Sequence, residues 1–251
     1  MRTSAVFLGD DDMVCFLTSV PLTDRVTFGF KDVNGFLTEM KNEVKDNFRA
    51  LFICSDPDCH EKTDKFSTEI RESFEKSGIR FSQMEILDGR NKQCAGQLVE
   101  NSDFIILTGG HVPTQNKFFE EIGLKGLLAN FDGVLMGMSA GTMNSAEVVY
   151  AHPELDGEAT DPEYRRFLKG LGLTKAMVLP HYQDKKDDVL DGLRVFEDIA
   201  YPDSMGREFY AIPDGSYIFI KDGRQELRGE AWLIKDGVCE KISDVGEKII
   251  I

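Results

Sequence analysis

Short apolar segments alternate with helix-like segments through the middle of the chain, and this alternation limits the possible folds more than any other feature. The apolar runs have the length of strands, and the segments between them repeat apolar residues at helical spacing. The expected strands are residues 48–54, 79–86, 103–108 and 133–137, and the expected helices are residues 62–77, 92–100 and 116–130. Because parallel strands need helical crossovers, the pattern predicts an α/β fold, a mostly parallel sheet with helices on both faces.

The last third of the chain has a different pattern of apolar residues and turns. Residues 176–180 form one more expected strand, and residues 187–200 have the spacing of an amphipathic helix. Residues 215–251 predict a C-terminal antiparallel β extension, because the Lys-Asp-Gly sequences at 221–223 and 235–237 are hairpin signals.

Domain organisation is expected to be simple. The chain carries no internal repeat, low-complexity tract or linker, and 251 residues suit one large α/β unit. We therefore expect a single domain over residues 1–251. Residues 10–45 are the part in which no pattern is legible.

The charge of the chain excludes some partners. Acidic side chains number 44 and basic ones 29, for a formal net charge of −15. Nucleic-acid binding needs clustered Lys and Arg, and anionic membrane surfaces also attract basic proteins, so we expect neither partner. The 41% hydrophobic content excludes a disordered chain.

The cysteines and the apolar runs indicate a compartment. No apolar run approaches the roughly 18–20 residues that cross a bilayer, and the first residues lack the pattern of a signal peptide. The five cysteines are odd in number and scattered, which is not a disulfide framework. We expect a cytoplasmic protein with reduced thiols.

One cluster, Cys54, Cys59 and His60, has residue types that bind zinc. The two thiols are not spaced as a zinc-binding pair, and no second pair follows. We favour a buried Cys54 and a loop carrying Cys59 and His60, with no metal site. The chain also lacks the glycine-rich fingerprints of nucleotide binding, so no cofactor is expected.

The sequence Gly137-Met-Ser139-Ala-Gly141 carries the strongest chemical signal. It follows an expected buried strand and precedes a helix-compatible stretch, residues 142–150. In this position a Gly-x-Ser-x-Gly sequence is typical of a strained strand-to-helix turn that exposes the serine at the edge of a sheet. The alternative is a tight turn in which Ser139 only caps the helix.

A serine hydroxyl needs a base, and a histidine base needs a carboxylate. Of the four histidines, His181 is the best placed, because it follows an expected strand, where parallel-sheet folds assemble their sites. Asp214, which precedes another expected strand, can supply the carboxylate. Asp184, Asp187 and Asp188 are nearer in sequence, but they lie in a charged segment expected to face solvent.

Acyl transfer also needs two N–H groups that hold the oxyanion. The Ala140 N–H, directly after the serine, is one natural donor. The pair Gly109-Gly110, at the end of the preceding expected strand, is a plausible source of the second, because glycine leaves room for a substrate beside its amide. A plain tight turn is the alternative for this pair.

Four motifs, in this order, resemble the dipeptidase E and cyanophycinase family of serine peptidases. They are Thr108-Gly-Gly-His111, Gly137-Met-Ser-Ala-Gly141, Leu179-Pro-His-Tyr182 and Ile212-Pro-Asp-Gly215. The resemblance covers roughly residues 45–220 and implies a fold similar to the class I glutamine amidotransferase domain.

The resemblance also implies roles for individual residues. Ser139 would be the nucleophile, His181 the general base, and Asp214 would stand where dipeptidase E has a glutamate. The amides of Gly110 and Ala140 would hold the oxyanion. This chemistry requires no cofactor, and the partner would be a small peptide substrate.

Two departures concern specificity. His111 stands where the family pattern often has asparagine, and the stretch 147–154 is acidic or neutral where dipeptidase E is basic. A preference for N-terminal aspartate therefore does not carry over. His111, Arg165 and Arg166 are the candidate substrate-binding residues.

The function expected from the sequence is that of a serine peptidase that cleaves a short peptide or related amide through an acyl-enzyme on Ser139. A dipeptidase or a related exopeptidase is the expected type. The alternative is a non-catalytic protein that keeps the fold and binds a small ligand above Ser139. The sequence carries no signal for an oligomeric state.

Overall fold

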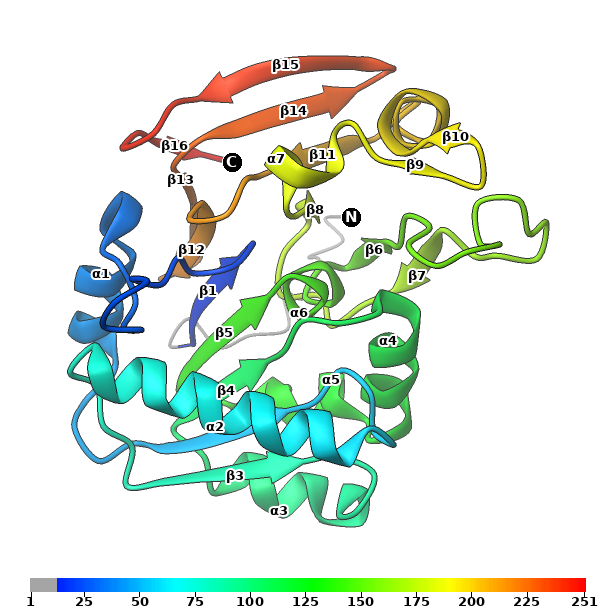
Figure 1. The fold of residues 1–251 in the computed structure, drawn as a ribbon. Coiled ribbons are helices and arrows are strands. Elements are labelled where there is room, and N and C mark those ends of the chain that lie inside the picture. Colours follow the sequence, from blue (N-terminus) through cyan, green and yellow to red (C-terminus); the bar gives the residue numbers. More distant parts are fainter. Residues whose placement is uncertain (1–12) are drawn as a thin grey trace, which may run out of the picture.

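The computed structural model describes residues 13–251, and an eight-stranded sheet forms its centre (Figure 1). Five neighbouring strands of this sheet are parallel: β1 (Val14–Thr18), β5 (Val134–Met138), β4 (Phe104–Leu107), β2 (Arg49–Ile53) and β3 (Gln83–Leu87). Three antiparallel strands continue it beyond β1: β12 (Tyr217–Lys221), β13 (Arg224–Arg228) and β16 (Lys248–Ile250). The predicted α/β class, with a mostly parallel sheet and a C-terminal antiparallel extension, is confirmed.

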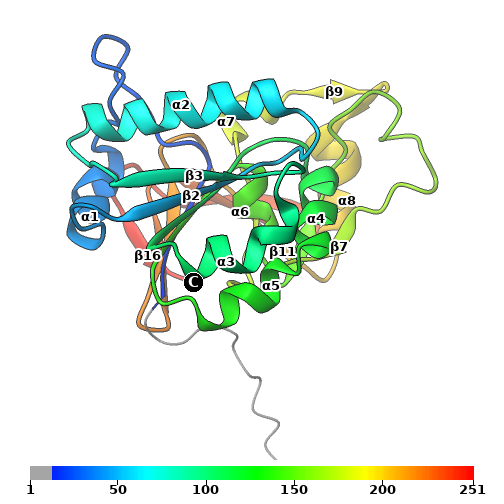
Figure 2. The same ribbon diagram turned by 90° about the horizontal axis from the view of Figure 1, so that it is seen from below.

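Helices cover both faces of the parallel strands, as predicted (Figure 2). One face carries α1 (Phe36–Glu43) and α2 (His60–Lys76), and the other carries α3 (Ala95–Glu100), α4 (Val112–Glu121) and α5 (Leu124–Leu127). Alternate strand residues supply the two cores. Phe52 of β2 packs with the first group of helices and Leu51 with the second, which is the two-sided burial that parallel strands require.

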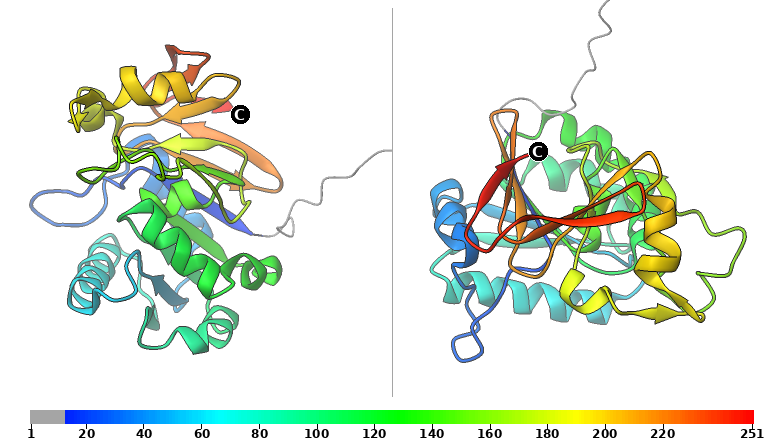
Figure 3. Two further views of the ribbon diagram at one scale, coloured as in Figure 1. Left: turned by 90° about the vertical axis from the view of Figure 1, so that its right-hand side faces the viewer. Right: turned by 90° about the horizontal axis from the view of Figure 1, so that it is seen from above.

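A second, four-stranded sheet lies at the end of the molecule away from β3 and α2 (Figures 1 and 3). Its order is β15 (Val238–Ser243), β14 (Ala231–Lys235), β11 (Glu208–Ala211) and β8 (Met177–Leu179). The strands β8 and β11 are parallel, so their carboxyl ends lie together, beside the main sheet. A small antiparallel pair, β6 (Val148–Tyr150) with β7 (Phe167–Lys169), completes this side.

The two Lys-Asp-Gly turns form as predicted. Asp222 and Gly223 both have positive φ, and so do Asp236 and Gly237. They join β12 to β13 and β14 to β15 as antiparallel hairpins. This is the two-residue turn geometry whose twist matches that of the flanking strands.

The helix predicted over residues 187–200 is wrong in its first half. Asp191 and Gly192 both have positive φ and form the turn of a hairpin between β9 (Val189–Leu190) and β10 (Leu193–Arg194). An Asp-Gly pair favours this turn over a helix, in which both φ values would be negative. Only Val195–Ala200 is helical, as a π-helix that continues into α8 (Tyr201–Asp203).

The helix-compatible stretch 142–150 is also mostly not helical. The helix α6 (Ala140–Asn144) has five residues, and the chain then enters β6. The carbonyl groups of Asn144 and Ser145 accept the N–H groups of Leu171 and Leu173, so tertiary hydrogen bonds replace the helical ones.

The strand β1 lies in the segment where the sequence showed no pattern. All five of its residues are buried, and it stands between β5 and β12 at the centre of the sheet. A strand buried on both faces has no polar alternation to reveal it, and four apolar residues followed by Thr18 do not by themselves distinguish strand from helix.

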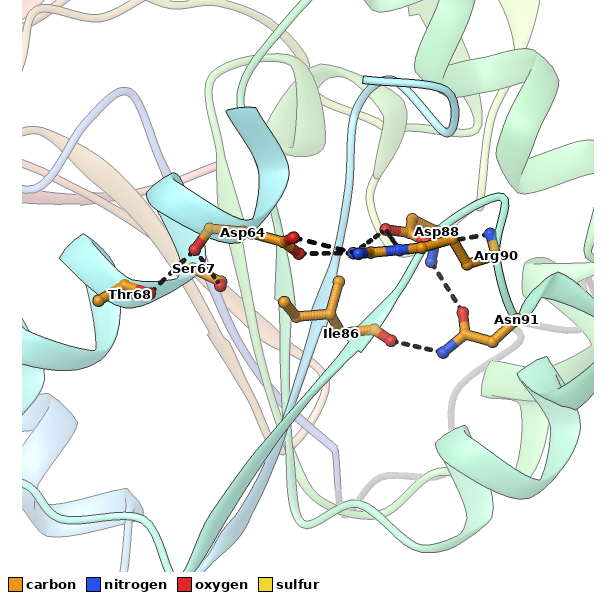
Figure 4. A network of polar contacts seen from close by, with 7 residues as sticks. All are labelled: Asp64, Ser67, Thr68, Ile86, Asp88, Arg90 and Asn91. Carbon is orange, nitrogen blue, oxygen red and sulfur yellow. Dashed lines mark hydrogen bonds and ion pairs between the residues drawn. The ribbon is translucent and has the colours of Figure 1, made fainter. Parts of the chain in front are cut away.

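A network of polar contacts ties α2 to the loop after β3 (Figure 4). The Arg90 guanidinium binds Asp64 of α2 at 3.1 Å and the buried Asp88 at 3.0 Å. The Asn91 side chain accepts the Asp88 N–H and donates to the Ile86 carbonyl. A buried carboxylate needs such partners, because without them its desolvation is uncompensated.

The aromatic core under α2 allows a test of the packing. Phe74 is fully buried and meets Phe30, Phe81 and Phe104 at ring-centroid distances of 4.9, 5.1 and 5.5 Å. Replacing it by alanine removes these contacts and leaves a cavity, so Phe74→Ala should lower the free energy of unfolding by about 3–5 kcal/mol. Urea denaturation measures this loss.

Phe28→Ala is the matched control, because it deletes the same atoms from a side chain that is 58% exposed. It should lower the free energy of unfolding by less than about 1 kcal/mol. Equal losses in the two variants would contradict the assigned core.

Candidate active site

Ser139 stands between β5 and α6 in a backbone conformation that few residues adopt. Its φ is 49° and its ψ is −111°. The Ser139 N–H lies 3.1 Å from the Thr18 carbonyl oxygen and 2.8 Å from that of Ser19 and donates to both. An L-residue stays in such a conformation only where the surroundings impose it, and the end of β1 supplies that restraint.

The glycines that flank Ser139 are required by close packing. A Cβ on Gly137 would lie 2.9–3.0 Å from atoms of Thr142, and one on Gly141 would lie 2.2 Å from the Leu107 carbonyl oxygen. Both distances are shorter than carbon contacts allow. Glycine is therefore needed at both positions, because a Cβ would collide with α6 at Gly137 and with β4 at Gly141.

The structure brings Ser139, His181 and Asp214 together. His181 Nε2 lies 2.9 Å from Ser139 Oγ, and His181 Nδ1 lies 2.8 Å from Asp214 Oδ1. His181 follows β8 and Asp214 follows β11, so the carboxyl ends of two parallel strands present both groups to the serine at the end of β5. His181 is also strained, with φ 58° and ψ 32°.

Asp214 is charged at neutral pH. Partial burial raises the pKa of its carboxyl, but the hydrogen bonds from His181 and Ser19 outweigh this effect, and the net pKa is below the usual value. The three other aspartates that the sequence offered lie elsewhere. Asp188, for example, pairs with Lys185 at 2.9 Å on a partly exposed surface.

Two side chains that the sequence did not single out complete the hydrogen bonds of this group. The Ser19 hydroxyl donates to Asp214 Oδ1 at 2.7 Å and accepts the backbone N–H of His181 at 2.9 Å. Gln183 Oε1 accepts the Asp214 N–H at 3.0 Å. Had residues 14–18 been recognised as a parallel strand, Ser19 would have been expected at this edge, because it directly follows them.

The glycine pair lies against Ser139. A Cβ on Gly109 would be 3.3 Å from Ser139 Cβ, and one on Gly110 would be 2.2 Å from Ser55 Oγ. The Gly141 N–H donates to the Thr108 carbonyl at 3.1 Å, which fixes the glycine loop beside the start of α6. Within residues 13–251, no backbone carbonyl accepts the N–H of Gly110 or of Ala140.

The arrangement has the parts of an acyl-transfer site. A serine hydroxyl, an imidazole and a charged carboxylate are joined by consecutive hydrogen bonds, and backbone amides stand next to the serine. The model of peptidase family S51 matches residues 26–228, which is most of the chain. The chain belongs to peptidase family S51. It is therefore a serine-type peptidase, as the four sequence motifs predicted.

Solved structures agree with this family in fold. A candidate peptidase E protein from Listeria monocytogenes EGD-e is 18% identical and superposes with a TM-score of 0.55, over 92% of this chain and 98% of that one. The similarity places the S51 peptidase in the class I glutamine amidotransferase-like fold that was predicted. No curated protein matches the sequence.

Two of the three candidate substrate-binding residues of the S51 peptidase, His111 and Arg166, have partners within the protein. His111 caps α4, and its ring nitrogens lie 2.8 Å from Thr114 Oγ1 and 2.9 Å from Glu158 Oε1. Arg166 binds the carboxylate of Asp203 at 3.0 Å. Arg165 is exposed and lines a cavity of about 630 Å³ between α4 and β7. Their roles toward a substrate stay predictions.

The cysteine cluster is spread over two environments. Cys54 is buried, whereas Cys59 is exposed at the start of α2, followed by His60. Across residues 13–251, no group of three His, Cys, Asp or Glu side chains lies close enough to hold a metal ion. In the same range, no helix is long and apolar enough to cross a membrane.

His152 is the second histidine near the site, and it is not placed as a base. It is 4% exposed, and its Nδ1 has no hydrogen-bond partner. Burial lowers its pKa from 6.5 to about 4, with smaller contributions from Lys185 and His181. His152 is therefore neutral in the folded protein at pH 7.

This burial predicts a pH dependence of stability. The unfolded chain binds a proton at His152 below pH 6.5, but the folded protein does so only below about pH 4. Above pH 6.5 His152 is neutral in both states and does not change the free energy of unfolding. As the pH falls from 6.5 to 4 the unfolded chain alone gains the proton, and the free energy of unfolding falls by about 3 kcal/mol.

Urea denaturation of wild type and His152→Gln at several pH values between 7 and 4 measures the effect. The variant should lose less stability over this range. The assignment is wrong if the two proteins have the same dependence on pH, whatever the difference in their absolute stabilities.

Proposed function

We propose that this S51 peptidase cleaves a short peptide or a related amide through an acyl-enzyme on Ser139. The observation that carries the proposal is the unbroken chain of hydrogen bonds from Ser139 Oγ through the His181 ring to Asp214 Oδ1, at 2.9 and 2.8 Å. These distances allow proton transfer without rearrangement of the side chains.

In the first half of the proposed reaction, His181 Nε2 accepts the Ser139 proton while Oγ attacks the substrate carbonyl carbon. The N–H groups of Gly110 and Ala140 hold the negative oxygen that forms. His181 then gives its proton to the leaving amine, the C–N bond breaks, and an ester on Ser139 remains.

In the second half, water takes the place of the amine. His181 removes a proton from the water, whose oxygen attacks the ester carbonyl, and the same two amides hold the oxyanion. The proton then returns to Ser139 Oγ, the ester bond breaks, and a free acid leaves. Protons and electrons balance over the cycle, so the net change is hydrolysis of one amide bond.

Asp214 would keep the proton of the histidine on Nδ1, so that Nε2 is free to accept, and would stabilise the imidazolium. Its pKa below the usual aspartate value supports this role, because the carboxylate stays charged over the pH range in which His181 works. The resemblance to dipeptidase E suggested a longer glutamate here, yet the shorter side chain is within 2.8 Å of the ring.

The proposed substrate is a small peptide, and a dipeptidase or related exopeptidase is the proposed type. The exposed Arg165, which lines the cavity between α4 and β7, would suit a carboxylate of such a substrate, with Arg166 and His111 as further candidates. We also propose a cytoplasmic location, supported by the five cysteines, which all lie within the described range and are free thiols.

Ser139→Ala tests the nucleophile. It should abolish hydrolysis of a panel of dipeptides and acyl-peptides with free N-termini, and it should abolish labelling by a fluorophosphonate probe, because no other activated hydroxyl is proposed. Circular dichroism should be unchanged, since alanine removes only the hydroxyl. Hydrolysis by pure Ser139→Ala protein at the wild-type rate would overturn the proposal.

Asp214→Asn and Asp214→Glu test the carboxylate. Asparagine has no negative charge to stabilise the imidazolium, so we expect kcat to fall about 10³-fold or more in Asp214→Asn. Glutamate keeps the charge and should retain more activity than asparagine. Steady-state kinetics at pH 7 measure both variants. Equal and small effects would show that another group orients His181.

A further inference from the structure

Ser19 is the one side chain within the described range that contacts both His181 and Asp214 while its backbone contacts Ser139. The Ser19 carbonyl oxygen accepts the Ser139 N–H at 2.8 Å. Its hydroxyl accepts the backbone N–H of His181 at 2.9 Å and donates to Asp214 Oδ1 at 2.7 Å. Ser19 is itself 0% exposed.

The fold explains why Ser19 can reach all three. It directly follows β1, and β1 pairs in parallel with β5, so that Thr18 stands beside Met138 and the Ser19 carbonyl comes within hydrogen-bond distance of the Ser139 N–H. On its other side β1 pairs with β12, which begins just after Asp214. Ser19 therefore lies where the two sheets meet, between the strand ends that carry the serine, the histidine and the aspartate.

The hydroxyl of Ser19 restrains the backbone of His181. His181 has a left-handed conformation, which is strained for an L-residue and persists only where other contacts impose it. The hydrogen bond from the His181 N–H to Ser19 Oγ is such a contact. A change in this backbone would move the ring away from Ser139 Oγ.

The same hydroxyl also acts on Asp214. Ser19 Oγ and His181 Nδ1 both donate to the same oxygen, Oδ1. The carboxylate is thus held in one orientation, and part of its charge is compensated by a donor that does not titrate. Without the hydroxyl, the carboxylate would interact more strongly with the His181 ring, which favours the protonated form of the imidazole.

We propose that Ser19 is a positioning residue of the hydrolytic reaction, whose hydroxyl sets the orientation of His181 and Asp214 relative to Ser139. The proposal rests on the proposed function, because it assigns Ser19 to the same reaction. Ser19 touches no substrate atom in this scheme and acts through its two neighbours.

Ser19→Ala is the first test. It keeps the carbonyl that holds Ser139 and removes only the hydroxyl. We expect kcat to fall about 10–100-fold with KM changed less than about threefold, because alignment and not binding is lost. The acid limb of the profile of kcat/KM against pH should move to higher pH, since His181 must be neutral to act as the base.

A second pair of variants separates the hydroxyl from the shape of the side chain. Ser19→Thr and Ser19→Val have the same shape, but only threonine has a hydroxyl. Threonine should recover at least tenfold more kcat than valine. Equal activity of the two would mean that packing at this position matters and the hydrogen bonds do not, which overturns the proposal.

Ser204 provides a matched control. It is also 0% exposed, its hydroxyl donates to the Tyr201 carbonyl at 2.7 Å, and it accepts the Gly237 N–H at 2.9 Å. Ser204→Ala likewise removes one donated and one accepted hydrogen bond of a buried serine, but away from the site, and should leave kcat and the pH profile unchanged. A loss equal to that of Ser19→Ala would overturn the proposal.

NMR of the histidine rings gives a readout that needs no turnover. In a Ser139→Ala background, adding Ser19→Ala should raise the measured pKa of His181. Asp214, after β11, and His152, after β6, are titratable groups that interact with His181, and Asp184 and Lys185 of the following helix α7 (Tyr182–Lys185) donate backbone N–H groups to its carbonyl. None of them is altered in this comparison, so an unchanged pKa would contradict the proposal.

The two proposals fail in different ways. Hydrolysis by pure Ser139→Ala protein would overturn the proposed function whatever Ser19 does. If Ser139→Ala is inactive while Ser19→Ala keeps the kcat and the pH profile of the wild type, the function stands and the positioning role of Ser19 is overturned.

Discussion

The parallel pairing of β1 with β5 is the contact on which the rest of the structure depends. It places the carbonyl groups of Thr18 and Ser19 where they accept the Ser139 N–H, and so it holds the serine in a backbone conformation that the chain would otherwise leave. The pairing also buries all of β1 between the two helical layers. The same strand thus holds the strained backbone of Ser139 and forms the centre of the core.

The site is assembled from strand ends that belong to two sheets. Ser139 follows β5 of the main sheet, whereas His181 and Asp214 follow β8 and β11 of the second. The hydrogen bonds of Ser19 and Gln183 join these segments, so that the relative placement of the sheets and the geometry of the three side chains are linked. A site built this way is rigid because each element that carries a group is also packed into a core.

The sequence predicted most where local chemistry decides the conformation. The hairpins at Asp222 and Asp236 formed because aspartate and glycine tolerate positive φ, and the same rule shows why the helix expected over 187–200 is interrupted at Asp191. Prediction failed where contacts with distant segments decide the conformation. The stretch after Asn144 is compatible with a helix, but the Leu173 N–H binds the Ser145 carbonyl and the Glu147 N–H binds that of Thr174, so the chain enters β6 instead.

By itself, the sequence determined the α/β class, the helices on both faces, the glycines around Ser139, and the family to which the chain belongs. These follow from periodicity, from the absence of a Cβ and from ordered motifs, all of which can be read along the chain without knowing which distant segments meet. Only the tertiary structure decided that β1 is the central strand, that Asp214 and not Asp184, Asp187 or Asp188 reaches His181, and that Ser19 joins them. Those choices depend on which distant strand ends become neighbours, and strand pairing is a property of the whole folded chain.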